Sequence, residues 1–88
     1  MIYRVEFSDR ARKDFSRLDR SLQRRIGIRI DELADNPRDA RVSGTLTNAG
    51  DLRKSRVGGW RIIFTIDDAN RVVYLVTIER RGQVYERL

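Results

Sequence analysis

The spacing of hydrophobic residues changes after Pro37, and no other feature of the sequence constrains the fold as much. Before Pro37, apolar residues recur at helical spacing, which is typical of amphipathic helices. After a polar stretch, apolar and polar residues alternate in short runs, which is typical of strands with one buried face. A chain of 88 residues that contains both patterns is expected to form one domain, residues 1–88, in which helices pack on a sheet.

The first half predicts a short strand and two helices. Residues 2–7 alternate as a strand does, and Ser8 is a typical N-cap for the helix that follows. Residues 19–21 interrupt the helical pattern, and Asn36 lies before a proline, which ends the second helix. The expected apolar positions are Ala11, Phe15, Leu18 and Leu22 in the first helical run, and Leu22, Ile26, Ile30 and Leu33 in the second.

The second half predicts a meander of three strands. We expect them at residues 52–57, 60–66 and 71–78, joined by a two-residue turn at Gly58-Gly59 and a turn at residues 67–70. Residues 38–50 lack a period and are expected to form a loop, and the apolar third strand should lie inside the sheet. The fold class is therefore α+β: an N-terminal strand, a two-helix hairpin on one face of a mostly antiparallel sheet, and the meander.

The composition excludes several kinds of site. The chain has no Cys and no His, so it lacks disulfides, thiolate chemistry, the commonest general base and the usual zinc ligands. We therefore expect no cofactor and no metal. The N-terminal residues do not read as a signal peptide, and no apolar run is long enough to span a membrane, so we expect a cytoplasmic protein without a membrane partner.

Positive charge is concentrated in the second half. Lys and Arg together number 19 against 13 acids, for a net charge of +6, and all but two of the bases are Arg. Residues 52–66 hold four bases and no acid. Because Arg binds phosphate through paired hydrogen bonds, this balance favours a polyanion or an acidic protein as partner. A solvated, Arg-rich surface is the alternative.

The period of two in a strand places the basic side chains. Trp60 begins an apolar row that the helices are expected to cover, which leaves Arg61 on the open face. Lys54 and Arg56 share one face of the preceding strand and are expected to join it there. Three more side chains follow the third strand and are expected to reach the same surface: Arg80, Arg81 and Tyr85. The acids Glu6, Asp9 and Asp14 are expected to be solvated or to lie at a helix start, and Asp67 and Asp68 to be turn residues.

A cationic cluster of this kind is suited to phosphate chemistry. Arg stabilises the extra negative charge of a pentacovalent transition state, and RNA supplies its own nucleophile in the 2′-OH. Neighbouring cations disfavour the charged form of a lysine, so a lysine within the cluster can serve as a general base. The alternative is that basic residues on an edge hairpin only prevent the addition of another strand.

Several segments in order resemble a known family. They are YRVEFSDRARKDFSRL, the Asn-Pro pair after the second helix, DLRKSRVGGWRIIF, and VVYLVTIERRGQVYERL. Together they cover nearly the whole chain and resemble the RelE/ParE superfamily of bacterial toxin–antitoxin toxins. In the RelE branch, the resemblance implies cleavage of mRNA in the ribosomal A site through the 2′-OH, leaving a 2′,3′-cyclic phosphate. In the ParE branch, it implies inhibition of DNA gyrase without cleavage. Either branch implies a cognate antitoxin as partner.

The resemblance also implies roles for single residues. Lys54 matches the position credited with general-base or charge-stabilising work, and Arg61 matches the Arg that contacts the scissile phosphate. Arg81 matches the Arg that stabilises the leaving group or transition state. Tyr85 matches the Tyr that stacks on the substrate or deprotonates it. The expected substrate-binding residues are Arg56, Arg53 and Arg80.

Some positions depart from the family pattern. Leu52 replaces a second Lys of some active members. Glu79 replaces the usual Gly and is expected to pair with Arg80 or Arg81. Arg53 and Ser55 replace core apolar residues, which predicts a twisted or partly exposed strand.

Three functions remain open from the sequence. The four catalytic candidates together favour a ribosome-dependent mRNA endonuclease with the 70S ribosome, mRNA and a RelB-like antitoxin as partners. A ParE-like gyrase inhibitor is the alternative, and a basic DNA-binding module ranks last because no segment reads as a helix-turn-helix.

Overall fold

The first helix begins at the predicted cap Ser8, whereas the second begins inside the predicted break at residues 19–21, since Arg20 and Ser21 are already helical. In the computed structural model, which describes residues 2–81, the Ser8 hydroxyl accepts a hydrogen bond from the Ala11 N–H at 2.9 Å, at the start of α1 (Asp9–Ser16). The Asp19 carboxylate accepts from the Leu22 N–H at 2.8 Å, at the start of α2 (Arg20–Asp35). Asn36 has an extended backbone and ends α2 before the proline, as predicted.

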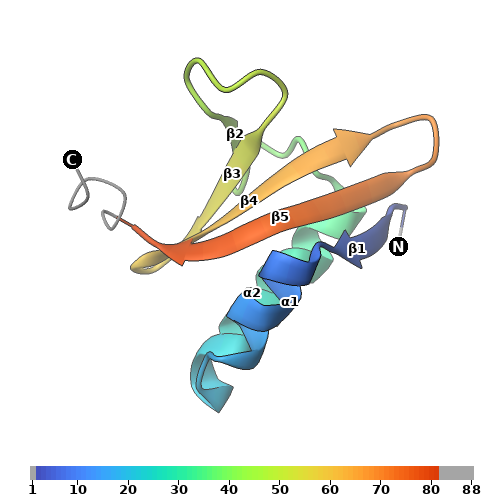
Figure 1. Cartoon of the computed structure of the whole chain (residues 1–88). Helices are drawn as coiled ribbons and strands as arrows, with labels where there is room; N and C mark the ends of the chain where they lie inside the picture. Colours follow the sequence, from blue (N-terminus) through green and yellow to red (C-terminus); the bar gives the residue numbers. More distant parts are fainter. Residues whose placement is uncertain (1, 82–88) are drawn as a thin grey trace.

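In the described part of the chain, five strands form a single mixed sheet (Figure 1). They are β1 (Arg4–Phe7), β2 (Gly44–Thr45), β3 (Arg53–Val57), β4 (Trp60–Asp67) and β5 (Val72–Arg80). Their order across the sheet is β1-β5-β4-β3-β2, and among these strands only β1 and β5 pair in parallel. The α+β class, the meander and the interior place of β5 are confirmed.

One strand lies where a loop was expected. Gly44 and Thr45 form β2, which pairs with Lys54 and Arg53 at the edge of the sheet. The expectation that residues 38–50 are entirely a loop is therefore wrong. So short a strand has no room for an alternating pattern, and its partner β3 supplies the pairing.

The helices cover the face of the sheet that carries the row beginning at Trp60. Ile62 and Phe64 of β4 are fully buried in one core with Ile26 and Leu33 of α2, and Trp60 packs partly buried against that core. Figure 1 shows α1 and α2 together on one side of the sheet. The predicted covered face is thus confirmed, and the opposite face carries no helix among residues 2–81.

A β-bulge interrupts the pairing of β4 with β5. Phe64 pairs with Leu75, but Ile63 pairs with Thr77, so Val76 is an extra residue in β5. Three contacts from the α1 region hold this bulge: the Ser8 hydroxyl donates to the Val76 carbonyl at 2.7 Å, and the Asp14 carboxylate accepts from the Thr77 hydroxyl at 2.9 Å and the Ile78 N–H at 3.0 Å.

Asp14 is therefore not the solvated acid that was expected. Its side chain is only 12% exposed, because it is buried between α1 and β5. Beyond the bulge, β5 continues to Arg80, two residues past the predicted end of the strand. Within the described residues, no helix is long and apolar enough to cross a membrane.

Candidate functional site

Three basic side chains gather on the face of the sheet opposite the helices. Arg56 of β3 lies directly across from Arg61 of β4, and Lys54 pairs with Ile63 two positions along the same face. We call Lys54, Arg56 and Arg61 the open-face cluster. Its common face is the one expected from the period of two in the strands.

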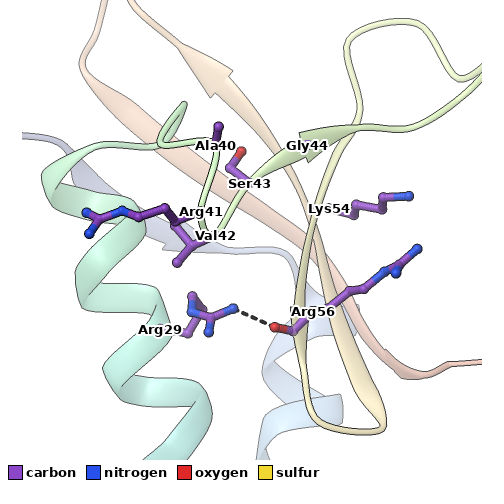
Figure 2. A pocket seen from close by; sticks show the side chains of 8 residues that line it. All are labelled: Arg29, Ala40, Arg41, Val42, Ser43, Gly44, Lys54 and Arg56. Atoms are coloured by element: carbon purple, nitrogen blue, oxygen red, sulfur yellow. Dashed lines mark hydrogen bonds between the residues drawn. The ribbon is translucent and has the colours of Figure 1, made fainter.

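A hollow of about 260 Å³ borders this cluster at the edge of the sheet. Its lining residues come from α2, the segment before β2, and β3: Arg29, Ala40, Arg41, Val42, Ser43, Gly44, Lys54 and Arg56. Four of these eight are bases and none is an acid. In Figure 2, the side chains of Lys54 and Arg56 extend to the same side of β3, while Arg29 and Arg41 lie on its other side.

Arg29 joins α2 to the back of β3. Its guanidinium donates to the Arg56 carbonyl, a hydrogen bond drawn in Figure 2. It also donates to the Ser55 hydroxyl and to the Glu32 carboxylate, each at 3.0 Å. Ser55 is 1% exposed, so the expectation of a partly exposed strand is wrong at this position. A polar group can be buried there because Arg29 supplies its hydrogen-bond partner.

Sequence reasoning did not single out Arg29. The available signal was its spacing: Arg25 and Arg29 lie four residues apart, each directly before a buried isoleucine on α2. That places both guanidinium groups at the border between the helix and the sheet edge.

Arg41 contributes an exposed cation to the hollow. It forms an ion pair with Asp39 at 2.7 Å. Hydrogen bonds from the Arg41 side chain and backbone lower the pKa of Asp39 to about 2, and the same contact raises the pKa of Arg41. Both groups therefore stay ionised at neutral pH, and Arg41 was also missed by the sequence reasoning because its loop has no regular pattern.

Arg61 forms a close ion pair within the sheet. Its Nε and Nη2 atoms donate to a single carboxylate oxygen of Glu79 at 2.9 and 2.7 Å. The expectation that Glu79 pairs with Arg80 or Arg81 is wrong, and the bulge is the reason. Without the extra residue Val76, Arg61 would face Ile78; the shift of one position places Glu79 opposite Arg61 instead.

The same shift turns Arg80 away from the cluster. Arg80 pairs with Trp60, and its guanidinium carbon lies 5.8 Å from the centre of the Trp60 ring. It borders a second hollow, of about 230 Å³, together with Arg10 and Arg17 of the α1 region. The expectation that Arg80 reaches the open face is therefore wrong.

Arg53 also lies on the helix side. It pairs with the core residue Phe64, and its Nε donates to the Ser43 hydroxyl at 2.9 Å. Of the three expected substrate-binding residues, Arg56 belongs to the open-face cluster, whereas Arg53 and Arg80 lie on the other face.

Arg81 lies at the turn between β3 and β4. Its backbone N–H donates to the Gly59 carbonyl at 2.8 Å, and its guanidinium donates to the Gly58 carbonyl at 3.2 Å. Arg81 is thus held beside the turn that connects Arg56 to Arg61. Tyr85, the fourth catalytic candidate, lies outside the described residues. Among residues 2–81, no three His, Cys, Asp or Glu side chains are grouped so that they could hold a metal ion.

Known proteins match this chain over almost all of its length. The family model for the ParE toxin of the type II toxin–antitoxin system, parDE, matches residues 5–85. A putative RelE-like toxin protein of Escherichia coli is 26% identical over 83 residues, which span 92% of this chain and 85% of the relative.

Solved structures share the fold. The archaeal RelE–RelB complex from Pyrococcus horikoshii OT3 contains a chain that is 25% identical, with a TM-score of 0.79 over 94% of this chain and 99% of that one. The isolated E. coli RelE toxin is 22% identical, with a TM-score of 0.78 over 97% of this chain and 93% of that one. The match of the family model over residues 5–85 shows that the chain belongs to the RelE/ParE superfamily of type II toxin–antitoxin toxins.

Proposed function

We propose that this toxin is a ribosome-dependent mRNA endonuclease that acts in the cytoplasm and stops translation. One observation carries the proposal: the open-face cluster places three cations on a face that no helix among residues 2–81 covers, beside a hollow lined by two further Arg residues. Such a surface suits the closely spaced phosphates of a single RNA strand.

The proposed reaction is attack of an RNA 2′-oxygen on the adjacent phosphorus. A bond forms between the 2′-oxygen and phosphorus, the bond from phosphorus to the 5′-oxygen breaks, and a 2′,3′-cyclic phosphate remains. Lys54 is the candidate to accept the 2′-OH proton, and Arg61 the candidate to stabilise the charge on the equatorial oxygens. Arg81 is the candidate to stabilise the negative charge on the leaving 5′-oxygen, which then takes up a proton from solvent. Tyr85 keeps its proposed role in stacking or proton transfer.

The ribosome is needed in this proposal because the cluster is open. The hollow beside it lies at the edge of the sheet, and no helix among residues 2–81 covers the cluster, although Glu79 encloses part of the Arg61 side chain. A ribosome that holds the mRNA can supply the orientation, which contributes up to ~7–11 kcal/mol of barrier reduction in favourable cases.

The proposed protein partner is a RelB-like antitoxin. Two of the similar solved structures are complexes: the RelE–RelB complex from P. horikoshii and the toxin–antitoxin complex RelBE2 from Mycobacterium tuberculosis. An antitoxin that neutralises this toxin should cover the open-face cluster or displace the tail that bears Tyr85.

Inhibition of DNA gyrase is the second candidate. It is favoured by the family model, which describes ParE toxins, and by the ion pair that neutralises Arg61. Under this alternative, the chain binds gyrase and cleaves no RNA.

Cell-free translation and gyrase supercoiling, measured with the same purified protein, separate the two candidates. We expect inhibition of translation, unchanged supercoiling, and a loss of about 100-fold in translation inhibition for Arg61→Ala, which is typical for removal of one transition-state donor. Lys54→Ala should lose translation inhibition to a similar extent. Arg53→Ala is the matched control, since it removes a base from the same strand on the opposite face and should retain inhibition. Inhibited supercoiling with normal translation would replace the proposal with the gyrase function.

A further inference from the structure

Glu79 lies within the basic face and makes its shortest contacts with Arg61. The two residues face each other across β4 and β5, and both side chains are largely enclosed, at 20% and 22% exposed. One Glu79 oxygen accepts hydrogen bonds from both Nε and Nη2 of Arg61. The carboxylate therefore occupies the edge of the guanidinium that can form paired hydrogen bonds.

The position of Glu79 gives the face an internal anion. Arg61 also lies directly across from Arg56 on β3, so the three neighbouring side chains across the sheet are Arg56, Arg61 and Glu79: two cations followed by an anion. A carboxylate and a phosphodiester present the same kind of charged oxygen to a guanidinium. An RNA phosphate that approaches Arg61 therefore meets a guanidinium edge that Glu79 already occupies. The Glu79 carboxylate also repels the phosphate, because water screens this partly enclosed charge only in part.

We propose that Glu79 is an internal competitor for the phosphate of RNA at Arg61. The open-face cluster is then partly neutralised at rest, and an RNA phosphate must displace the carboxylate before Arg61 can bind it. This inference rests on the proposed function for the identity of the anion. It makes the toxin a weak binder of free RNA and favours a strand that is held in place, as an mRNA is on a ribosome.

The test is the affinity for a fluorescein-labelled, single-stranded 2′-O-methyl RNA hexanucleotide, followed by fluorescence anisotropy. The blocked 2′ positions prevent cleavage, so only binding is measured. Glu79→Gln should lower Kd about tenfold, equivalent to ~1.4 kcal/mol. Glu79→Ala should change Kd in the same direction, so the test does not depend on the folding of one variant.

Glu6→Gln is the matched control. It makes the same change in net charge, and Glu6 is paired with Arg4 on β1, an edge strand that is separated from the Arg61 strand β4 by β5. We expect its Kd to fall less than about twofold, because an exposed charge at that distance is screened. In an Arg61→Ala background, Glu79→Gln should lower the Kd for RNA by no more than Glu6→Gln does.

Three results would overturn the inference: a Glu79→Gln variant that binds no tighter than Glu6→Gln, one that binds more weakly than the wild type, or a gain that persists in full without Arg61. The second result would mean that Glu79 holds Arg61 in place for its ligand. The outcome is separate from the endonuclease proposal. If Glu79→Gln binds RNA more tightly but the wild type shows no ribosome-dependent cleavage, the inference stands and the endonuclease proposal fails. If the wild type cleaves mRNA but Glu79→Gln binds RNA no more tightly, the endonuclease proposal stands and the inference fails.

Discussion

Asp14 shows how a single residue sets the geometry of the site. Its carboxylate accepts from the Thr77 hydroxyl and the Ile78 N–H, both next to the bulge in β5. The bulge in turn places Glu79 opposite Arg61 and turns Arg80 to the other face. An acid on α1 thus determines which side chains of β5 reach the open-face cluster.

Removing this carboxylate should destabilise the fold. Asp14→Ala leaves two partly buried donors without their partner, which costs about 1–3 kcal/mol in the free energy of unfolding. Urea denaturation measures this change. Asp31→Ala, which removes an exposed acid from α2, is the control and should stay within about 0.5 kcal/mol of the wild type. An Asp14→Ala variant as stable as the control would show that the bulge does not depend on this carboxylate.

The β3–β4 hairpin is the element that carries the open-face cluster, and its turn depends on one glycine. Gly58 has φ +59°, and a Cβ there would lie 2.6 Å from the Arg25 guanidinium. Gly58→Ala should therefore lower the free energy of unfolding by about 1–2 kcal/mol, mainly through the left-handed backbone.

Thermal denaturation checks this prediction, with Gly59→Ala as the neighbouring control. A Cβ at Gly59 meets no atom within 4 Å, so that variant should lose less than half as much stability. Equal losses for the two variants would contradict the assignment of the strain to Gly58.

Some features of the helices and strands can be predicted from the sequence, and others cannot. The start of α1, the end of α2 and the strand faces follow from local signals, namely the cap at Ser8, the Asn-Pro pair and the alternation from Trp60 onward, and the structure confirms them. The bulge is not local: its contacts join Asp14 to residues more than sixty positions away. Since a shift of one residue reverses every later side chain, the pairing of Glu79 and the face of Arg80 were mispredicted.

At the scale of the whole molecule, Asp68 joins segments that lie far apart in the sequence. It accepts from the Tyr3 hydroxyl at 2.7 Å and from two nitrogens of Arg38 at 3.0 and 2.8 Å. These hydrogen bonds, from Arg38 first and Tyr3 second, lower the pKa of Asp68 from 3.8 to about 2. Asp68 is thus more than the turn residue expected from the sequence.

The lowered pKa predicts a contribution to acid sensitivity. The folded protein binds the Asp68 proton less readily than the unfolded chain, so this stabilisation is present above about pH 5 and is lost as the pH falls towards about 2. Asp68→Asn should be less stable at neutral pH and should lose less stability on acidification. Urea midpoints measured across this range test the point, with Asp31→Asn as the charge-matched control. Parallel pH profiles for wild type and Asp68→Asn would contradict it.

The most direct test of the proposed function is primer extension on a defined mRNA, with purified toxin, in the presence and absence of programmed ribosomes. We predict cuts within the A-site codon that require ribosomes and disappear in Arg61→Ala, while Arg53→Ala still cuts. The absence of cuts with wild-type toxin that arrests growth, or cuts that persist unchanged in Arg61→Ala, would contradict an endonuclease centred on the open-face cluster.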